Sequence, residues 1–131
     1  MKALLDTHVF LWWIMDAPQL PPHVRELIAD GENELYLSVA SCWEITIKAG
    51  LGKITLPARP DVYIASQMTE NAVQGLPIEA KHAFQVFHLP PYHRDPFDRL
   101  LIAQAQVEGL PIITSDPLFS EYKVKILWDK K

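Results

Sequence analysis

Four acidic residues stand where a carboxylate can do chemistry. Asp6 and Asp116 each end a short apolar run, whereas Glu44 and Asp98 lie near the start of predicted helices. Each has a structural explanation of its own, because acidic side chains cap helices and turns. If the four meet in a partly buried cleft, however, their mutual repulsion must be offset, and hard divalent cations such as Mg²⁺ do this best. The pattern therefore predicts metal-assisted hydrolysis of a phosphodiester.

The clearest local pattern is the stretch from His93 to Ala105. Asp95 is a good N-cap, Pro96 suits the first helical position, and Asp98 falls at N3, from which its carboxylate can reach back to the cap. The helix that follows, 96–108, is apolar on nearly all sides and is predicted to be buried. Taken alone, Asp98 is either a capping group or one ligand of a site.

Short apolar strands alternate with helices along the chain. We predict strands at 2–6, 35–39, 111–116 and, at an edge, 123–127, with a brief extended piece at 76–78. The predicted helices cover 7–16, 22–30, 41–50, 61–73, 79–87 and 96–108. In the helix 41–50, Ser41 is the expected cap and Glu44 occupies the capping-box position.

This alternation predicts an α/β layer fold with a mainly parallel central sheet. Ligands of such sheets bind outside the carboxyl ends of the strands, which is where Asp6 and Asp116 are expected. The 131 residues suit a single domain spanning 1–131, and a composition of 49% hydrophobic and 21% charged residues excludes a disordered chain.

Charge, cysteine content and apolar runs narrow the functional classes. The net charge of −4 does not indicate a nucleic-acid binder, but carboxylates that await cations lower this figure without excluding one. Cys42 is the one cysteine, which excludes an intrachain disulfide, fits a reducing cytoplasm and is expected to be buried. The apolar run 9–15 is too short to span a bilayer, so we expect neither a membrane segment nor a signal peptide.

Four segments together carry a resemblance: Asp6-Thr7-His8, 38–45, 95–103 and 114–116. In their order and spacing they resemble the PIN-domain family, and more closely the VapC-type toxin ribonucleases of toxin–antitoxin pairs. The resemblance extends over essentially the whole chain. It implies an α/β/α sandwich, a Mg²⁺ or Mn²⁺ site and endonucleolytic cleavage of RNA.

The resemblance also assigns roles to the acidic residues. The acidic positions of the family match Asp6, Glu44, Asp98 and Asp116. Asp6, Asp98 and Asp116 would ligate the principal metal, and Glu44 would hold a second metal or orient the attacking water. Asp98 is chosen over Asp95 because the family's apolar and alanine spacing starts at Asp98. Asp95 is then the N-cap, with a direct or water-mediated metal role left open.

Further polar residues are candidates for binding RNA or water. Bridging waters or a phosphate are assigned to Thr7, Thr114 and Ser115, and phosphate neutralisation to Arg94, Arg99, Lys48, Lys53 and Arg59. Each of these charges is alternatively a solvated surface group. No histidine is needed as a base. A histidine–metal site is not expected, because no helical i, i+4 histidine pair occurs among the histidines near the motifs, His8, His88 and His93.

The helix 7–16 carries more apolar surface than one core face needs, through Leu11, Trp12, Ile14 and Met15. This excess predicts contact with another protein, which would be a second copy in a homodimer or a segment of a cognate antitoxin.

Three other functions are weighed against the nuclease. A phosphoacceptor receiver would need an adjacent acidic pair after the first strand, and a dehalogenase-like phosphatase would need an aspartate where His8 stands. The main alternative is a PIN fold that serves as a non-catalytic binding or scaffold module. The complete set of four carboxylates argues against that module.

Overall fold

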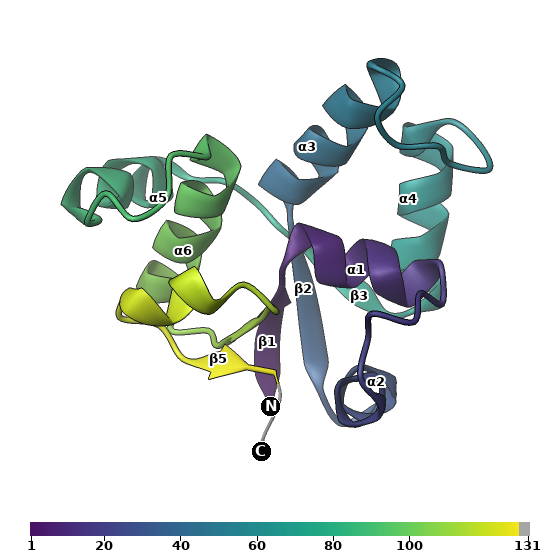
Figure 1. Ribbon diagram of the computed structural model, residues 1–131, viewed down its shortest axis with the longest axis horizontal. Coiled ribbons are helices and arrows are strands. Elements are labelled where there is room, and N and C mark those ends of the chain that lie inside the picture. Colours follow the sequence, from purple (N-terminus) through teal and green to yellow (C-terminus); the bar gives the residue numbers. More distant parts are fainter. Residues whose placement is uncertain (129–131) are drawn as a thin grey trace.

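The computed structural model describes residues 1–128, and its centre is a five-stranded sheet in the order β3-β2-β1-β4-β5 (Figure 1). All neighbouring strands pair in parallel. The strands are β1 (Lys2–Leu5), β2 (Glu34–Ser38), β3 (Val73–Leu76), β4 (Ile112–Ile113) and β5 (Ile126–Leu127). The predicted parallel sheet is confirmed, and β5 forms one edge as expected.

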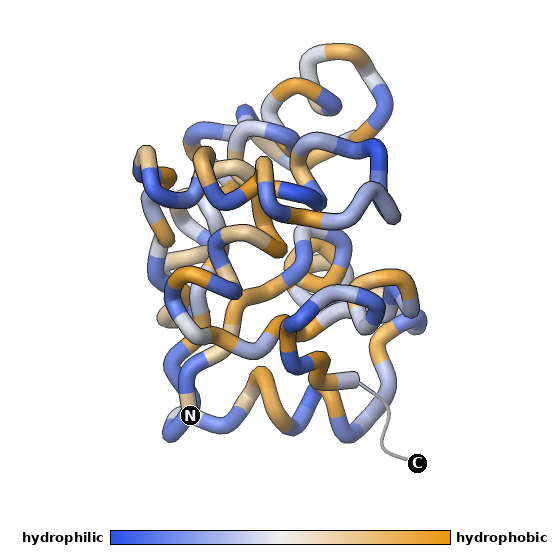
Figure 2. The backbone as a smooth tube through the Cα atoms, turned by 90° about the vertical axis from the view of Figure 1, so that its left-hand side faces the viewer, coloured by the Kyte–Doolittle hydropathy of each residue, from blue (hydrophilic) through white to orange (hydrophobic). Residues whose placement is uncertain are grey.

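Helices connect these strands. They are α1 (Thr7–Ile14), α2 (Pro22–Ala29), α3 (Val39–Gly50), α4 (Pro60–Glu70), α5 (Ala80–Gln85) and α6 (Pro96–Glu108), with 3₁₀ turns η1 (Val86–His88) and η2 (Pro117–Glu121). Gly109 ends α6 in the left-handed conformation, with φ of 69°, as its predicted terminal position requires. In Figure 2 hydrophobic and hydrophilic residues alternate along the helices, which is typical of helices with one face against a core.

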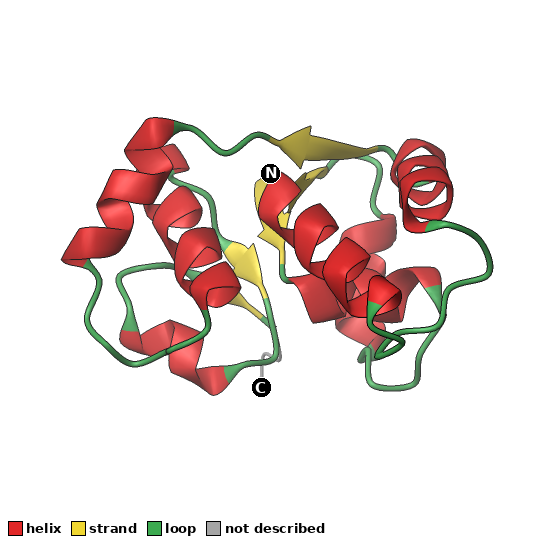
Figure 3. Ribbon diagram, turned by 90° about the horizontal axis from the view of Figure 1, so that it is seen from above, coloured by secondary structure: helices red, strands yellow, loops and turns green. Residues whose placement is uncertain are grey.

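The core is divided between the two faces of the sheet, because alternate residues of a strand point to opposite sides. Leu5 and Ile113 pack with buried residues of α1, α2, α3 and α4. Leu4 and Ile112 pack on the other face with α6 and η2. Figure 3 shows helices on both sides of the strands. The predicted α/β/α sandwich is therefore confirmed.

The start of α3 differs from the prediction. Ser38, not Ser41, is the N-cap, and its hydroxyl accepts a hydrogen bond from the N–H of Ala40. Both serines have suitable chemistry, but β2 delivers the chain directly into the helix at Ser38. Ser41 is buried inside α3 and accepts a hydrogen bond from Thr7. The predicted capping box with Glu44 is therefore wrong, which leaves the Glu44 carboxylate available for another role.

Other boundaries also differ. The helix predicted at 61–73 ends at Glu70, and β3 begins at Val73, where the prediction had only a brief extended piece at 76–78. Sequence patterning missed this strand because its middle residues, Gln74 and Gly75, are exposed and have low strand preference. The segments predicted as strands at 111–116 and 123–127 pair over only two residues each. Helix 7–16 ends two residues earlier, and 79–87 divides into α5 and η1.

Cys42 is half-buried, so the expectation of full burial is wrong, although it still packs against the core. Among residues 1–128, no helix combines the length and the apolar composition needed to cross a membrane.

Candidate functional site

The four predicted acidic residues come from four separate segments around the carboxyl ends of β1 and β4. Asp6 directly follows β1, and Asp116 follows β4 and caps η2. Asp98 lies in the first turn of α6, and Glu44 projects from the middle of α3. Asp6 and Glu44 are only 5% and 4% exposed, a burial that carboxylates rarely reach unless they are paired.

Threonine hydroxyls fix the strand ends. Thr114 Oγ1 donates to Asp6 Oδ2 over 2.8 Å and accepts the N–H of Asp116 over 3.1 Å. Thr7 Oγ1 donates to Ser41 Oγ over 2.7 Å, which joins the start of α1 to α3. Both threonines were predicted to bind water or phosphate. The structure gives both hydroxyls partners within the protein: Thr114 contacts the Asp6 carboxylate, whereas Thr7 contacts Ser41.

The surroundings of Asp98 disfavour its ionised form. Burial is the main cause that raises its pKa to about 7, and the carboxylates of Asp95, Asp6 and Glu44 add to the effect while His93 opposes it. Burial also raises the pKa of Asp6, against the opposing hydrogen bond from Thr114. In the described part of the chain, no hydrogen-bond donor contacts the Asp98 side chain. The carboxylates thus share one electrostatic environment.

Asp95 has the predicted capping role. Its Oδ1 accepts the N–H groups of Phe97 over 2.8 Å and of Asp98 over 3.2 Å. The reciprocal hydrogen bond of a capping box, from the N–H of Asp95 to the Asp98 carboxylate, is not formed among the described residues, so Asp98 does not reach back to the cap as the sequence pattern suggested. Asp98 therefore has no structural task in the helix start.

Lys48 supplies positive charge beside the cluster. Its Nζ lies 2.7 Å from Glu44 Oε2, one helical turn earlier in α3. The hydrogen bond to Glu44 is the main cause that raises the pKa of Lys48, and the nearby Asp95 and Asp98 contribute as well. Lys48 is half-exposed, so it remains accessible to a bound polyanion.

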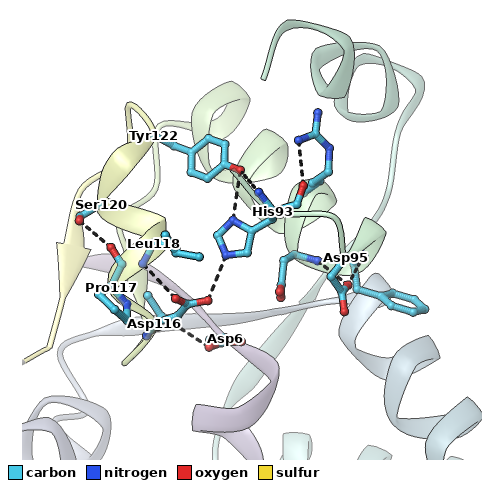
Figure 4. Close-up of polar contacts among 12 residues, drawn as sticks. Asp6, His93, Asp95, Asp116, Pro117, Leu118, Ser120 and Tyr122 are labelled. Atoms are coloured by element: carbon cyan, nitrogen blue, oxygen red, sulfur yellow. Dashed lines mark hydrogen bonds and ion pairs between the residues drawn. The ribbon is translucent and has the colours of Figure 1, made fainter. Parts of the chain in front are cut away.

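His93 lies beside Asp98 and Asp116, although the sequence pattern predicts no histidine–metal site. One ligand atom each from His93, Asp98 and Asp116 fit within 4.8 Å of one another. The ring Nε2 lies 3.0 Å from Asp116 Oδ2, and the contact is drawn in Figure 4. Its only sequence signal is its place two residues before the cap of α6. Spacing rules for helical histidine pairs cannot detect a contact that tertiary folding creates.

The predicted arginines separate into different environments. The Arg99 guanidinium donates to the carbonyl oxygens of Val86, Leu89, Pro90 and His93, so it holds the loop before α6. We therefore no longer assign Arg99 to the substrate. Arg94 is exposed near the site, and Arg59 is exposed and paired with Asp61. Ser115 is exposed beside Asp116.

A cleft of 420 Å³ opens beside the acidic cluster. It is lined by Thr7, His8, Leu11, Glu44, Ile45, Lys48, Lys53 and Ile54. A second hollow of 580 Å³ shares His8, Leu11, Lys53 and Ile54 with it and continues along α1 past Trp12 and Met15. The acidic cluster thus borders a groove with lysines at its edge and apolar side chains along its length.

The residues present fit a hard divalent cation. The cluster offers carboxylate oxygens, the ligands that Mg²⁺ and Mn²⁺ prefer, and no cysteine. Burial first, and then the neighbouring carboxylates, raise the pKa of Asp98. A bound cation would favour the ionised form of this carboxylate.

Solved structures share this fold. A chain of the VapBC2 complex from Rickettsia felis, bound to a promoter DNA fragment, has a TM-score of 0.73 at 18% identity, with 98% of this chain and 100% of that chain covered. A chain of DNA-bound VapBC from Salmonella typhimurium gives 0.71 at 18% identity, with 97% of each chain covered. A chain of FitAB bound to the IR36 DNA fragment gives 0.70 at 19% identity, covering 100% of this chain and 98% of that one.

Comparison with curated protein sequences gives no significant match. The PIN domain, in contrast, matches residues 3–125, a range that contains the four acidic residues, strands β2, β3 and β4 and most of β1. The chain belongs to the PIN domain family.

Proposed function

We propose that this protein is a metal-dependent endoribonuclease and the toxin component of a toxin–antitoxin pair, acting in the cytoplasm. The observation that carries the proposal is that Asp98 lies close to Asp116, and that Asp6 and Glu44 are near enough to contribute to the raised pKa of Asp98, which is about 7. A cluster with this excess charge suits binding of a divalent cation and a phosphate. The family and the toxin–antitoxin complexes that share the fold agree with this function.

In the proposed site, Asp6, Asp98 and Asp116 hold Mg²⁺ or Mn²⁺, and Glu44 holds a second ion or orients the attacking water. The bound cation would lower the pKa of a water molecule and stabilise charge on the phosphate oxygens. Thr114 keeps Asp6 in place through its 2.8 Å hydrogen bond. Asp95 serves the cap of α6 and so fixes the direction in which Asp98 enters the site.

The RNA backbone would follow the groove beside the cluster. Lys48 and Lys53 line the cleft of 420 Å³, and Arg94 is exposed and directly precedes Asp95, the N-cap of α6. These side chains neutralise phosphates without reading sequence. Ser115 is placed to bind a water or a phosphate oxygen at the rim.

The deciding experiment compares cleavage of a labelled RNA pool by the wild type and Asp98→Asn, with Mg²⁺, with Mn²⁺ and with EDTA. The substitution keeps the side-chain size but removes one charge of the proposed metal site. We expect metal-dependent cleavage by the wild type and its loss in the variant. Asp61→Asn is the matched control, because Asp61 is exposed on α4 and lies outside the cluster.

Each outcome has a distinct meaning when circular dichroism shows that all three proteins are folded. Equal cleavage by the wild type and Asp98→Asn would refute the assigned site. RNA binding by the wild type without cleavage, and without Mn²⁺ binding in a titration, would favour the non-catalytic binding module instead.

The proposed antitoxin occupies the apolar hollow along α1. Leu11, Trp12 and Met15 line this hollow, which is continuous with the cleft beside Glu44. A peptide bound there would exclude RNA from the acidic cluster. We expect the product of a neighbouring gene to bind this chain and to inhibit cleavage, and Trp12→Ala to weaken that binding.

A homodimer is proposed through the exposed face of α3. Val39, Trp43, Ile47 and Leu51 follow one another at intervals of four residues and are 44%, 59%, 38% and 66% exposed. Such a continuous apolar stripe is typical of a helix that packs against another protein. Light scattering should report a dimer for the wild type and a monomer for Ile47→Glu.

A further inference from the structure

His93 stands in the middle of three hydrogen-bonded side chains (Figure 4). Its Nδ1 lies 3.1 Å from the hydroxyl of Tyr122, and its Nε2 lies 3.0 Å from Asp116 Oδ2. The backbone N–H of His93 donates to the same hydroxyl over 2.8 Å. His93 and Tyr122 are 9% and 4% exposed, and the His93 ring packs edge-on against Phe119. Packing therefore fixes the orientation of the ring.

The chemistry of these groups assigns the protons. An ionised carboxylate only accepts hydrogen bonds, so Nε2 must carry the proton that it shares with Asp116. The Tyr122 hydroxyl already accepts the backbone N–H, and its own proton needs an acceptor because the group is buried. Within residues 1–128, the acceptor that this hydroxyl faces is Nδ1 of His93. Tyr122 thus donates to Nδ1, and the ring donates from Nε2.

We propose that His93 is a positioning residue: held by Tyr122 as the Nε2–H tautomer, it orients the Asp116 carboxylate and does not itself ligate a metal. The inference rests on the proposed function, in which Asp116 binds the cation. The ring is close enough to Asp98 and Asp116 to serve as a ligand. A protonated Nε2, however, has no lone pair to offer, and metal ligands are commonly oriented by a neighbouring hydrogen-bond partner of this kind.

Both carboxylate oxygens of Asp116 accept a hydrogen bond. Oδ1 accepts the N–H of Leu118 over 2.9 Å, and Oδ2 accepts from His93 over 3.0 Å. Two donors on opposite oxygens fix the plane of the carboxylate, while each oxygen keeps a free lone pair for a cation. His93 is itself anchored, because Arg99 donates to its carbonyl oxygen over 3.3 Å. The loop before α6 is thereby linked to the end of β4.

The tautomer can be measured directly on the metal-free protein. Long-range proton–nitrogen correlation spectra at pH 8, with ¹⁵N-labelled histidine, distinguish Nε2–H from Nδ1–H rings. The His93 signals are assigned by their absence from the spectrum of His93→Gln. We expect Nε2–H. An Nδ1–H tautomer, or protons on both nitrogens, would overturn the inference.

Affinity for a metal ion tests whether the hydrogen bond from Nε2 of His93 helps Asp116 to bind a cation. In His93→Gln the amide nitrogen reaches the place of Nε2 and can still donate to Asp116, whereas His93→Asn reaches only the place of Nδ1. Calorimetric titration with Mn²⁺ should show affinity reduced by about 10- to 100-fold in His93→Asn and His93→Ala, and mostly retained in His93→Gln. Circular dichroism confirms that each variant is folded.

The outcomes separate this inference from the proposed function. If His93→Gln binds Mn²⁺ as weakly as His93→Ala, the ring nitrogen is a ligand and the positioning role is refuted. Unchanged affinity in all three variants would also refute it. If the wild type itself binds no Mn²⁺, the proposed function fails, and the spectra of the metal-free protein still decide the tautomer.

Discussion

The hydroxyl of Thr114 donates a hydrogen bond to the carboxylate of Asp6 over 2.8 Å, although the two residues are 108 positions apart in the chain. This contact joins the carboxyl ends of β1 and β4, the neighbouring strands that deliver Asp6 and Asp116. Thr114 is fully buried. One hydroxyl thus sets the spacing of two of the four acidic residues, because it also accepts the N–H of Asp116.

Replacing Thr114 with valine keeps the shape of the side chain and removes the hydroxyl. We expect unfolding to become easier by about 1–3 kcal/mol, because Asp6 and the N–H of Asp116 lose their partner in a buried setting. Affinity for Mn²⁺ should fall as well. Urea denaturation and calorimetry measure the two effects. Thr114→Ser, which keeps the hydroxyl, should retain the affinity, and a valine variant with unchanged Mn²⁺ binding would contradict the role given to Thr114.

Asp98→Asn should stabilise the metal-free protein at pH 8. The pKa of Asp98 is raised to about 7 in the folded state, so folding binds protons and the stability of the wild type declines as pH rises from about 4 to 7. Asparagine does not pay this penalty. We expect a gain of about 1–2 kcal/mol above pH 7, less than the full shift implies because Asp98 is partly exposed.

Thermal unfolding of the chelated wild type and Asp98→Asn between pH 4 and 8 checks this prediction. The difference between the two proteins should grow with pH and level off above pH 7. Added Mn²⁺ should raise the melting temperature of the wild type more than that of the variant. A variant that is less stable than the wild type at pH 8 would show that Asp98 is not under electrostatic strain.

The sequence was sufficient to predict the parallel sheet and the positions of Asp6 and Asp116 at strand ends. These predictions rest on short apolar runs that each end in a carboxylate, and parallel strands bring such ends to one edge. The cap at Asp95 was equally readable, because capping depends on neighbours within three residues. Local chemistry and the rules of parallel sheets were therefore enough to predict where Asp6, Asp95 and Asp116 lie in the fold.

Contacts between segments that are distant in the chain could not be predicted from the sequence. The sequence pattern predicted Ser41 as the cap of α3, whereas the cap is Ser38 because β2 ends there. Arg99 was taken for a substrate contact because it follows Asp98, but its guanidinium reaches carbonyl groups of the preceding loop. His93 meets Asp116 only through the fold. In each case the chemistry of the residue suits more than one role, and contacts between distant segments determine which role it has.

Arg99→Met should destabilise the protein, whereas Arg94→Gln should not. Arg99 satisfies carbonyl oxygens before α6, including that of Pro90 over 3.0 Å, and leaving them without a donor should cost about 1–3 kcal/mol. Arg94 is exposed, so its replacement should change stability by less than about 0.5 kcal/mol. Denaturation curves measure the contrast.

The variants of Arg94 and Arg99 also distinguish an effect on RNA binding from an effect on stability. If Arg94 contacts phosphates, Arg94→Gln should raise KM for RNA with little change in kcat, and the effect should diminish as salt increases. Unchanged KM at low salt would remove Arg94 from the substrate-binding set. Equal stability of the wild type and Arg99→Met would contradict the structural role of Arg99.

Two substitutions of Asp95 distinguish a capping role from a metal-binding role. Asparagine is as good an N-cap as aspartate, so Asp95→Asn should keep the stability of α6, while Asp95→Ala should lose about 1 kcal/mol. Because Asp95 Oδ1 is engaged with the N–H groups of Phe97 and Asp98, we expect Asp95→Asn to retain Mn²⁺ affinity and RNA cleavage. A stable Asp95→Asn protein that had lost Mn²⁺ affinity would instead make Asp95 a member of the metal site, and the cap would then be its second task.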